Sequence, residues 1–300
     1  LEKIGGRLRA TRSELMEKNV LIYSNNNPQS LELKEELITK IKATDIRIVD
    51  ENEAPDFIIS IGGDGTLLSA FHEFKHYVNS TRFIGIHTGH LGFYTDWQSF
   101  ELDEVIEGIR QSKGESVSYP LLKVEMTLTD NSTKNVLALN EFSVRSFKGT
   151  MVCEVYIKEH FFETFRGDGI CISTPTGSTG LNKSLGGAVI HPRLDAIQLT
   201  EMASVNNRVY RTLSSSMIIP RDEWFVLHLT DEEDDRGISI DNMSFNHMPV
   251  KMIRLQLAAE RIRFASFRHM HFWDRVENSF IGRKQGRLQG QPSGSMNYLK

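Results

Sequence analysis

Cysteine is scarce in this chain of 300 residues, where only Cys153 and Cys171 occur. Two cysteines without metal-ligand spacing supply neither a disulfide framework nor a zinc site, so we expect buried free thiols in a reducing cytosol. No apolar run approaches the roughly 18 residues that a membrane-spanning helix needs, and the first residues lack the apolar core of a signal peptide. These absences favour a cytoplasmic protein that has no membrane partner.

An excess of positive charge is also absent, since the formal net charge is -4. General nucleic-acid binders are normally basic, so nucleic acid is not an expected partner. A local phosphate site remains open, because a few backbone N–H groups and one or two basic side chains hold a phosphate inside an acidic protein. The composition is that of a globular protein, with 39% hydrophobic and 25% charged residues.

Between residues 19 and 115, short apolar runs alternate with amphipathic helical patterns. This alternation predicts an α/β domain with a Rossmann-like parallel sheet. We expect strands at 20–23, 46–49, 57–61 and 83–86, and helices at 31–41, 66–77 and 102–109.

Between residues 116 and 266, one apolar strand pattern follows another, which predicts an all-β, sandwich-like domain. A cleft between the two domains is the default binding site. Residues 1–18 are predicted to be a flexible leader, 267–282 to pack back on the first domain, and 283–300 to be a disordered tail. The expected strands are 117–129, 135–145, 152–158, 169–173, 224–230, 236–241, 250–257 and 261–266, with one helix at 180–185.

The buried strand at 57–61 runs directly into Gly62-Gly63-Asp64-Gly65-Thr66. Glycines permit positive φ and close approach of the backbone to a ligand, and the helix that follows favours an anion at its N-terminus. We therefore predict phosphate binding by Gly62, Gly63, Gly65 and Thr66, with the Asp64 carboxylate exposed among these amides. The alternative is a simple turn that Asp64 caps, which three glycines between a buried strand and an amphipathic helix disfavour.

This glycine-rich turn is not a dinucleotide-binding fingerprint. Leu68 stands where the G-x-G-x-x-G pattern needs its third glycine. A Rossmann-type dehydrogenase is therefore disfavoured.

A second polar segment, residues 173–188, is rich in hydroxyls and glycines and leads into a helix. Such a segment suits phosphate or ribose hydroxyls, although a polar linker is the alternative. It departs from a P-loop, because Asn182 replaces the second glycine, and from a nucleophile elbow, because the pattern starts with Thr176.

Three weaker features accompany these two segments. Asn140-Glu141 offers an amide and a carboxylate for a ribose diol, and 166–169 (Arg-Gly-Asp-Gly) offers a charged pair, although each is by default a turn. His87 and His90 are three residues apart, and we interpret them as structural or ligand-adjacent rather than as metal ligands. The acidic run at 231–235 lacks a calcium-loop pattern.

Taken together, these motifs resemble the NAD kinase family, most closely its shorter members from Gram-positive bacteria. The GGDGT turn, the Asn-Glu pair and the TPTGSTGLNKSLGG loop stand in that family's order, and His87-Thr88-Gly89-His90-Leu91-Gly92-Phe93 adds to the likeness. The resemblance covers about residues 20–282. Lipid kinases of the diacylglycerol type carry a related GGDGT turn, so that turn alone is not specific.

The resemblance implies an enzyme that transfers the γ-phosphate of ATP to the 2′-hydroxyl of the adenosine ribose of NAD. It also implies a homo-oligomer with NAD at the domain and subunit junction, and Mg²⁺ or another divalent cation bridging the phosphates, with no metal ligand assigned. Asp64 is then the catalytic base. The resemblance places Phe93 at the adenine, Asn140 and Glu141 at the nicotinamide-side ribose, and Asp168 and Ala203 near the nicotinamide. It places Thr179, Asn182 and Ser184 at the adenine and ribose. The further implied NAD-binding residues are Gly65, Arg166, Gly180, Leu181 and Lys183.

Two departures from the family pattern are visible. Gly180-Leu181 stands where some members have Ala-Tyr, so a stacking aromatic is lost. Asp241-Asn242 follows the strand at 236–241 and has no assigned role. The alternatives are a lipid kinase of the diacylglycerol type, against which the Asn-Glu pair and the 174–187 loop count, and a non-catalytic nucleotide-binding module, against which an intact Asp64 counts.

Overall fold

The computed structural model describes residues 17–89, 92–230, 236–268 and 270–282. The predictions for the leader up to residue 16, for His90, for 231–235 and for the tail at 283–300 lie outside the described residues, as does residue 269 of the predicted 267–282 segment. No described helix combines the length and the apolar character that crossing a bilayer requires.

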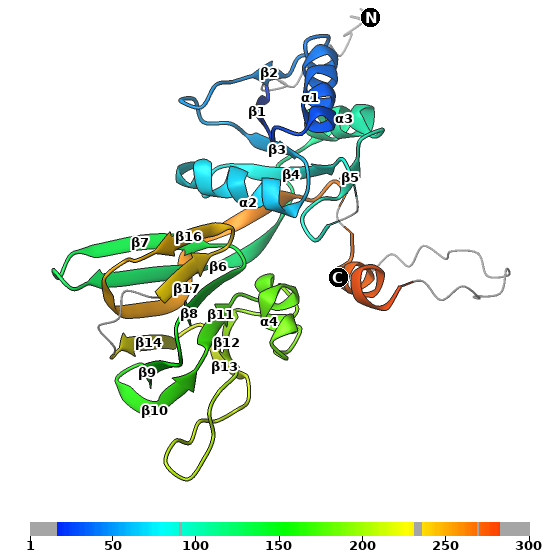
Figure 1. Cartoon of the computed structure of the whole chain (residues 1–300). Coiled ribbons are helices and arrows are strands. Elements are labelled where there is room, and N and C mark those ends of the chain that lie inside the picture. The colour runs from blue at the N-terminus through cyan, green and yellow to red at the C-terminus, as the bar shows by residue number, and fades with distance from the viewer. Residues whose placement is uncertain (1–16, 90–91, 231–235, 269, 283–300) are drawn as a thin grey trace, which may run out of the picture.

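A parallel sheet forms the core of the N-terminal domain, with strand order β2-β1-β3-β4 and with β5 pairing to β4 (Figure 1). Helices connect the strands, as the alternating sequence pattern predicts. The elements are β1 (Asn19–Ser24), α1 (Pro28–Ile41), β2 (Arg47–Ile48), β3 (Phe57–Ile61), α2 (Asp64–Glu73), a 3₁₀ turn (Lys75–Tyr77), β4 (Arg82–His87), β5 (Trp97–Gln98) and α3 (Leu102–Gln111).

Both faces of this sheet are covered, because successive side chains of a strand point to opposite faces. Ile59 of β3 packs with Leu37 of α1 and Ile109 of α3, whereas its neighbour Ile58 packs with Phe71 of α2 on the opposite face. Of the three helices, α2, which begins at the GGDGT turn, therefore lies on the face that turns towards the second domain (Figure 1).

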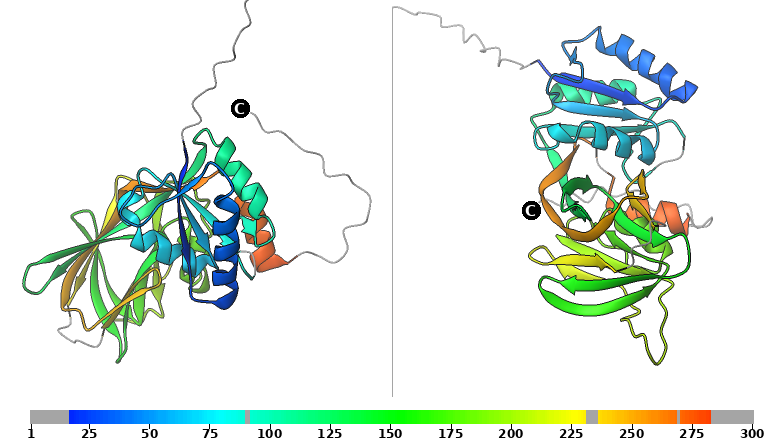
Figure 2. Two further views of the ribbon diagram at one scale, coloured as in Figure 1. Left: turned by 90° about the horizontal axis from the view of Figure 1, so that it is seen from above. Right: turned by 60° about the vertical axis from the view of Figure 1, so that its left-hand side comes forward.

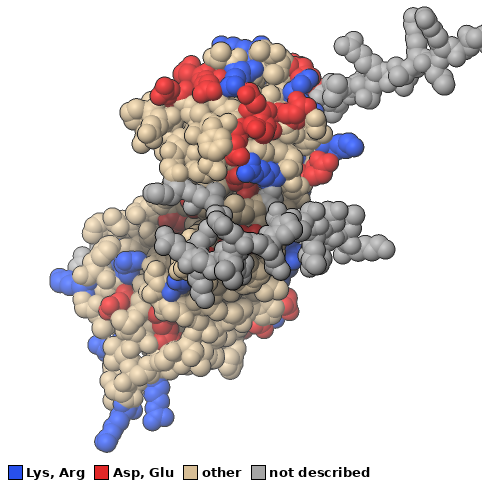
Figure 3. All heavy atoms as spheres, turned by 90° about the vertical axis from the view of Figure 1, so that its right-hand side faces the viewer, with Lys and Arg blue, Asp and Glu red and all other residues tan. Residues whose placement is uncertain are grey.

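Acidic side chains gather on the outer surface of this domain (Figure 3).

The C-terminal domain is a β-sandwich whose two antiparallel layers enclose one apolar core. One layer has the order β13-β12-β11-β8-β15-β16, and the other contains β10-β9-β14-β17 with β6 and β7. The elements are β6 (Ser116–Leu128), β7 (Thr133–Ala138), β8 (Glu141–Ser146), β9 (Met151–Ile157), β10 (His160–Gly167), β11 (Gly169–Ser173), a 3₁₀ turn (Gly177–Thr179), α4 (Leu181–Ser184), β12 (Ala196–Met202), β13 (Met217–Pro220), β14 (Trp224–Leu229), β15 (Arg236–Ile240), β16 (Met243–Asn246) and β17 (Val250–Ala265).

Strand β17 joins the two domains into one continuous sheet. It pairs antiparallel with β6 along the sandwich and then parallel with β4, where Phe264 lies opposite Phe83 (Figure 2). The predicted strands 250–257 and 261–266 are therefore one strand, since the irregularity between Leu257 and Arg261 lets the chain bend without leaving the sheet.

The fold class expected from the sequence is confirmed, with differences in detail. The predicted strand 135–145 is two strands, β7 and β8, which lie in different layers of the sandwich. Five further strands, β5, β10, β12, β13 and β16, have no counterpart in the prediction. Cys153 and Cys171 are buried and free, as expected.

The C-terminal segment contacts both domains. Phe267 packs against Phe57 and Trp97 of the first domain. The short helix α5 (Phe272–Val276) continues as a π-helical turn (Glu277–Ile281), and its Phe272 packs edge-on against His191 of the second domain. This segment therefore closes the junction between the domains.

Candidate active site

Asp64 is the first residue of α2, at the carboxyl end of β3. Its two carboxylate oxygens accept hydrogen bonds from the backbone N–H groups of Phe93 (2.8 Å) and Tyr94 (2.9 Å). The side chain is half-buried rather than exposed, and the amides around it belong to the loop after β4 rather than to its own turn. The predicted exposed carboxylate is wrong on both points, because that loop folds over the turn.

The glycines of this turn act differently from one another. Gly62 has a φ of +149°, and a Cβ there would stand 2.2 Å from the Thr66 hydroxyl, so only glycine fits. Gly63 and Gly65 have no such constraint but are exposed, and a Cβ on either would meet nothing within 4 Å. The N–H of Thr66 already donates to the Gly63 carbonyl (3.0 Å), whereas the N–H groups of Asp64 and Gly65 at the start of α2 have no acceptor within the helix.

Gly92 lies against the carboxylate itself. A Cβ there would stand 2.2 Å from Oδ1 of Asp64, well inside any real contact. This glycine lets the 92–94 loop approach closely enough for its amides to hold Asp64.

Asn140 and Glu141 lie at the start of β8 and are held in place by Asp241. The Asp241 carboxylate accepts from the backbone N–H groups of Leu139 (2.8 Å), Asn140 (2.7 Å) and Glu141 (3.1 Å). The Asn140 side-chain oxygen in turn accepts from the Tyr94 hydroxyl. The Asn-Glu pair is therefore joined to the loop that holds Asp64.

Burial and, to a smaller extent, the nearby Asp241 carboxylate together raise the pKa of Glu141 to about 8. The side chain is therefore protonated at neutral pH and able to donate a hydrogen bond. Its Oε2 is buried and has no partner among the described residues. An unpaired buried carboxyl oxygen is costly, which marks it as a position for a ligand hydroxyl.

Asp241 and Asn242 also bind the two domains together. Nε2 of His72, on α2, donates to Asp241 Oδ2 over 2.8 Å, and the Asp241 side chain is fully buried. The Asn242 amide donates to Ser69 Oγ (2.8 Å) and to the Gly65 carbonyl (3.4 Å). The turn after β15 thus fixes α2 relative to the sandwich.

The loop after β11 packs directly on the Asn-Glu segment. The Thr174 hydroxyl donates to the Leu139 carbonyl (2.6 Å), and a Cβ on Gly177 would stand 2.0 Å from the Asn140 carbonyl oxygen. Thr176 also donates to the Leu139 carbonyl, over 3.1 Å. These buried bonds bring the second polar segment of the sequence to the first.

The residues of α4 divide into a buried and an exposed set. Asn182 is fully buried, and its side chain bonds to the carbonyls of Ser178 and Ala188 and to the Thr200 hydroxyl. Thr179 is also buried and donates to the Thr176 carbonyl. These bonds shape the loop from inside. The residues that face outwards are Gly180, Lys183 and Ser184, with Leu181 partly exposed.

Phe93 lies at the edge of this group. Its ring is 5.8 Å from that of Phe280, over which the Lys183 ammonium also lies, 4.1 Å from the centroid. Its carbonyl accepts from Arg275, a buried guanidinium that also pairs with Asp96. The C-terminal segment therefore fixes the loop that holds Asp64.

Arg166, Asp168 and Ala203 lie at the other end of β11 from the Thr174 loop. A five-residue strand separates the two groups by roughly 15 Å. Arg166 donates to Thr150 and lies 4.7 Å from the Tyr210 ring, while Asp168 and Ala203 are exposed. One chain does not bring these three residues to Asp64.

Sequence reasoning missed Tyr94, His72, Asp96 and Arg275. Their partners lie far away along the chain, up to 182 residues, and no local pattern indicates such pairs. Asp241-Asn242 was noticed as a polar pair without a role. His87 is buried with Nδ1 2.9 Å from the Gly89 carbonyl, and among the described residues no group of three or more His, Cys, Asp and Glu side chains could hold a metal ion.

The first domain is a parallel sheet with a glycine-rich turn at the end of a strand, and the Asp64 carboxylate of this turn lies between that sheet and the β-sandwich. This arrangement defines a nucleotide-dependent phosphotransferase. The comparisons narrow this class. Residues 12–114 match the ATP-NAD kinase N-terminal domain, and residues 139–226 match the ATP-NAD kinase C-terminal domain. The chain belongs to the NAD kinase family, as its motifs indicated, and these matches set aside the lipid-kinase alternative.

Curated relatives agree over nearly their whole length. The NAD kinase of Lacticaseibacillus paracasei is 53% identical over 88% of this chain and 99% of that protein. The NAD kinase of Enterococcus faecalis is 48% identical over 88% of this chain and 98% of that protein. The likeness to enzymes of Gram-positive bacteria is thereby confirmed.

Two solved structures share the fold at low identity. Yeast NADH kinase complexed with NADH has a TM-score of 0.77 at 19% identity, over 92% of this chain and 90% of that one. An NAD kinase from Archaeoglobus fulgidus in complex with ATP has a TM-score of 0.66 at 21% identity, over 88% and 98%.

Proposed function

We propose that this NAD kinase uses Asp64 as the general base for transfer of the γ-phosphate of ATP to the 2′-hydroxyl of the adenosine ribose of NAD. The observation that carries the proposal is the carboxylate itself. It stands at a strand's end beside free helix N-terminal amides and is oriented by two backbone N–H groups. Phosphoryl transfer needs positioning and charge stabilisation more than covalent help, so one oriented base suffices.

The donor phosphates lie, in this proposal, on the open side of the turn at Gly63 and Gly65. Both residues are exposed, and the N–H groups of Asp64 and Gly65 at the start of α2 have no acceptor within the helix. Gly62 and Thr66 shape the turn from behind. The Asp64 carboxylate then accepts the proton that the attacking hydroxyl loses.

A divalent cation, with Mg²⁺ as the first choice, fits the donors that are present. Mg²⁺ prefers oxygen ligands and is usually held by one or two carboxylates together with substrate phosphates. The described residues offer the carboxylate of Asp64 at the site and no cluster of three ligands, which suits a cation that arrives with ATP. Bound there, the cation would neutralise charge that develops on the phosphates.

NAD is proposed to lie against the Asn-Glu segment and the α4 loop. The protonated Glu141 and the Asn140 amide would hold one ribose, while the exposed residues around Gly180 and Ser184 would face the adenosine with Phe93. The buried Asn182 and Thr179 support this surface from inside. Without the aromatic that some members carry at Leu181, stacking there is weaker.

A homo-oligomer completes the site in this proposal. Arg166, Asp168 and Ala203 lie at the far end of β11, so they would reach the nicotinamide end of an NAD bound to a second copy of the chain. A cytoplasmic location is also proposed, since two free thiols favour a reducing compartment.

The test is formation of NADP from NAD, ATP and Mg²⁺ by the full chain and by Asp64→Asn. We expect kcat to fall by about 10²- to 10⁴-fold in the variant, the range for loss of a general base, with an unchanged melting temperature. The proposal is abandoned if the wild-type chain makes no NADP, or if Asp64→Asn matches it.

A further inference from the structure

The turn that follows α5 brings an aromatic ring to the proposed adenosine site. Phe280 lies in the π-helical turn Glu277–Ile281, and 41% of its surface is exposed. Its ring centroid is 5.8 Å from that of Phe93, and the two ring planes differ by 34°. Because the proposed function places Phe93 beside the adenosine, Phe280 extends this aromatic surface by a second ring.

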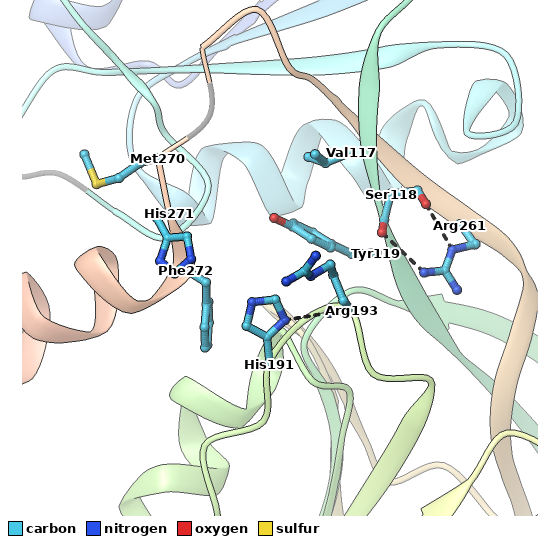
Figure 4. A pocket seen from close by; sticks show the side chains of 9 residues that line it. All are labelled: Val117, Ser118, Tyr119, His191, Arg193, Arg261, Met270, His271 and Phe272. Atoms are coloured by element: carbon cyan, nitrogen blue, oxygen red, sulfur yellow. Dashed lines mark hydrogen bonds between the residues drawn. The ribbon is translucent and has the colours of Figure 1, made fainter. Parts of the chain in front are cut away.

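The helix that leads to Phe280 is anchored at its beginning. The Phe272 ring lies edge-on to the His191 ring of the second domain, with the centroids 5.2 Å apart (Figure 4). The buried Arg275 donates to the Phe93 carbonyl. One anchored helix therefore holds the backbone of Phe93 and also carries the ring that lies beside the Phe93 ring.

The turn that carries Phe280 has little packing of its own. The Gly282 N–H closes it by donating to the Glu277 carbonyl over 3.0 Å, five residues back, and no side chain of the turn is buried. Turns of this π-helical kind are uncommon and are frequently found at functional sites. A flat ligand against Phe280 would supply packing that the turn lacks.

A cation orients the Phe280 ring from the side of α4. The Lys183 ammonium lies 4.1 Å from the ring centroid, and the negative face of an aromatic ring attracts such a charge. The ring is thereby held before a ligand arrives. Helix α4 (Leu181–Ser184) contributes no aromatic residue, so a stacking partner for a base must come from another segment.

We propose that Phe280 is a substrate-binding residue, whose ring forms with that of Phe93 the surface on which the adenine of NAD stacks. The inference rests on the proposed function, which places the adenosine at Phe93 and α4. A base stacks well on phenylalanine because both surfaces are flat and apolar. The C-terminal helix then has two roles, since it fixes the loop that holds Asp64 and binds the substrate.

Binding is tested by calorimetry on the full chain with NAD and with adenosine 5′-diphosphoribose, which keeps the adenosine and lacks the nicotinamide. We expect Phe280→Ala to weaken both ligands by the same factor, about tenfold or more, as loss of a stacking ring does. The matched control is Phe100→Ala, which removes a phenylalanine that is 76% exposed in the first domain and should leave both affinities unchanged.

Two further variants separate stacking from apolar packing. Phe280→Tyr keeps a flat ring and should bind both ligands within twofold of wild type. Phe280→Leu keeps an apolar side chain without the ring and should bind as weakly as Phe280→Ala. A Phe280→Leu variant with wild-type affinity overturns the proposal, because the ring itself would then contribute nothing.

The kinetics of NADP formation give a second readout. In Phe280→Ala the KM for NAD should rise by the factor seen in calorimetry, whereas kcat should fall less than twofold and the KM for ATP should stay the same. A rise in the KM for ATP alone overturns the proposal, since the ring would then contact the donor.

The calorimetric outcomes distinguish this inference from the proposed function. If the wild-type chain binds neither ligand, the proposed NAD site is wrong and the inference is overturned with it. If the wild-type chain binds both and Phe280→Ala binds them equally well, the inference alone is overturned. A loss confined to NAD also overturns it, because Phe280 would then contact the nicotinamide half.

Discussion

Two turns of this molecule place an aspartate against backbone N–H groups of a distant segment, and they differ in access. Asp64 accepts two such bonds from the 92–94 loop and remains half-exposed. Asp241 accepts three, from residues 139–141, takes a fourth bond from His72 and has no exposed side-chain area. The same kind of contact therefore orients a carboxylate that a substrate can reach at Asp64. At Asp241, which a substrate cannot reach, it holds the structure together.

The difference follows from what surrounds each carboxylate. The exposed Gly63 and Gly65 leave one side of Asp64 open. Asp241 lies between α2 and the sandwich, where His72 and the amides of the Asn-Glu segment use its oxygens. Removing Asp64 should therefore cost activity, and removing Asp241 should cost stability as well.

After loss of Asp64 itself, Gly92→Ala should have the largest effect on catalysis by Asp64. Its new Cβ would stand 2.2 Å from Oδ1, so the carboxylate or the loop must move. We expect kcat to fall about 100-fold, since small misplacements of a catalytic group have effects of that size. Gly89→Ala, in the same loop but with nothing within 4 Å of its Cβ, is the control and should stay near wild type. Equal activity of the two variants would contradict the close approach.

Asp241→Asn should lower the stability of the fold. The amide offers one acceptor oxygen where the carboxylate offers two, so at least one buried N–H loses its partner. We expect the free energy of unfolding to fall by about 2 kcal/mol, measured by urea denaturation. The KM for NAD should rise about tenfold, because the displaced segment carries Asn140 and Glu141. Asp222→Asn, whose side chain is 82% exposed, is the matched control. An Asp241→Asn variant with normal stability would show that the Asp241 carboxylate does not stabilise the fold.

Glu141→Gln tests the cost of burying the Glu141 carboxyl group beside Asp241. Its pKa of about 8 lies above the ordinary value of 4.5, so between these pH values the folded chain binds a proton that the unfolded chain has released. Stability from this group is therefore full below pH 4.5 and is lost as the pH rises through about 8. Melting temperatures across this range should fall for wild type and much less for Glu141→Gln. Parallel curves would refute the raised pKa.

Asn242→Ala should have the smallest effect. It removes the hydrogen bonds to Ser69 and Gly65, which are exposed and lie beside the turn rather than on the carboxylate. We expect the KM for ATP to change by about twofold, since such bonds contribute little net free energy. A change of more than tenfold would mean that Asn242 contacts the substrate directly.

The fold was largely predictable, because hydrophobic periodicity depends on neighbouring residues. The alternating strands and helices of the first domain and the later run of strands both appear in the structure. The errors have one cause. Strands β5, β10, β12, β13 and β16 were missed and β17 was divided, because pairing with other strands rather than local pattern decides where those strands begin and end.

Sequence alone determined the class of chemistry, because Gly62 to Thr66 and the segment after Thr174 are contiguous and their glycines and hydroxyls have local consequences. Only the tertiary structure decided the state of Asp64. The amides that orient it come from residues 93 and 94, the arginine that fixes those residues is Arg275, and the carboxylate that positions the Asn-Glu segment is Asp241. Hydrogen bonds between segments so far apart depend on how the layers pack, and no local pattern encodes them.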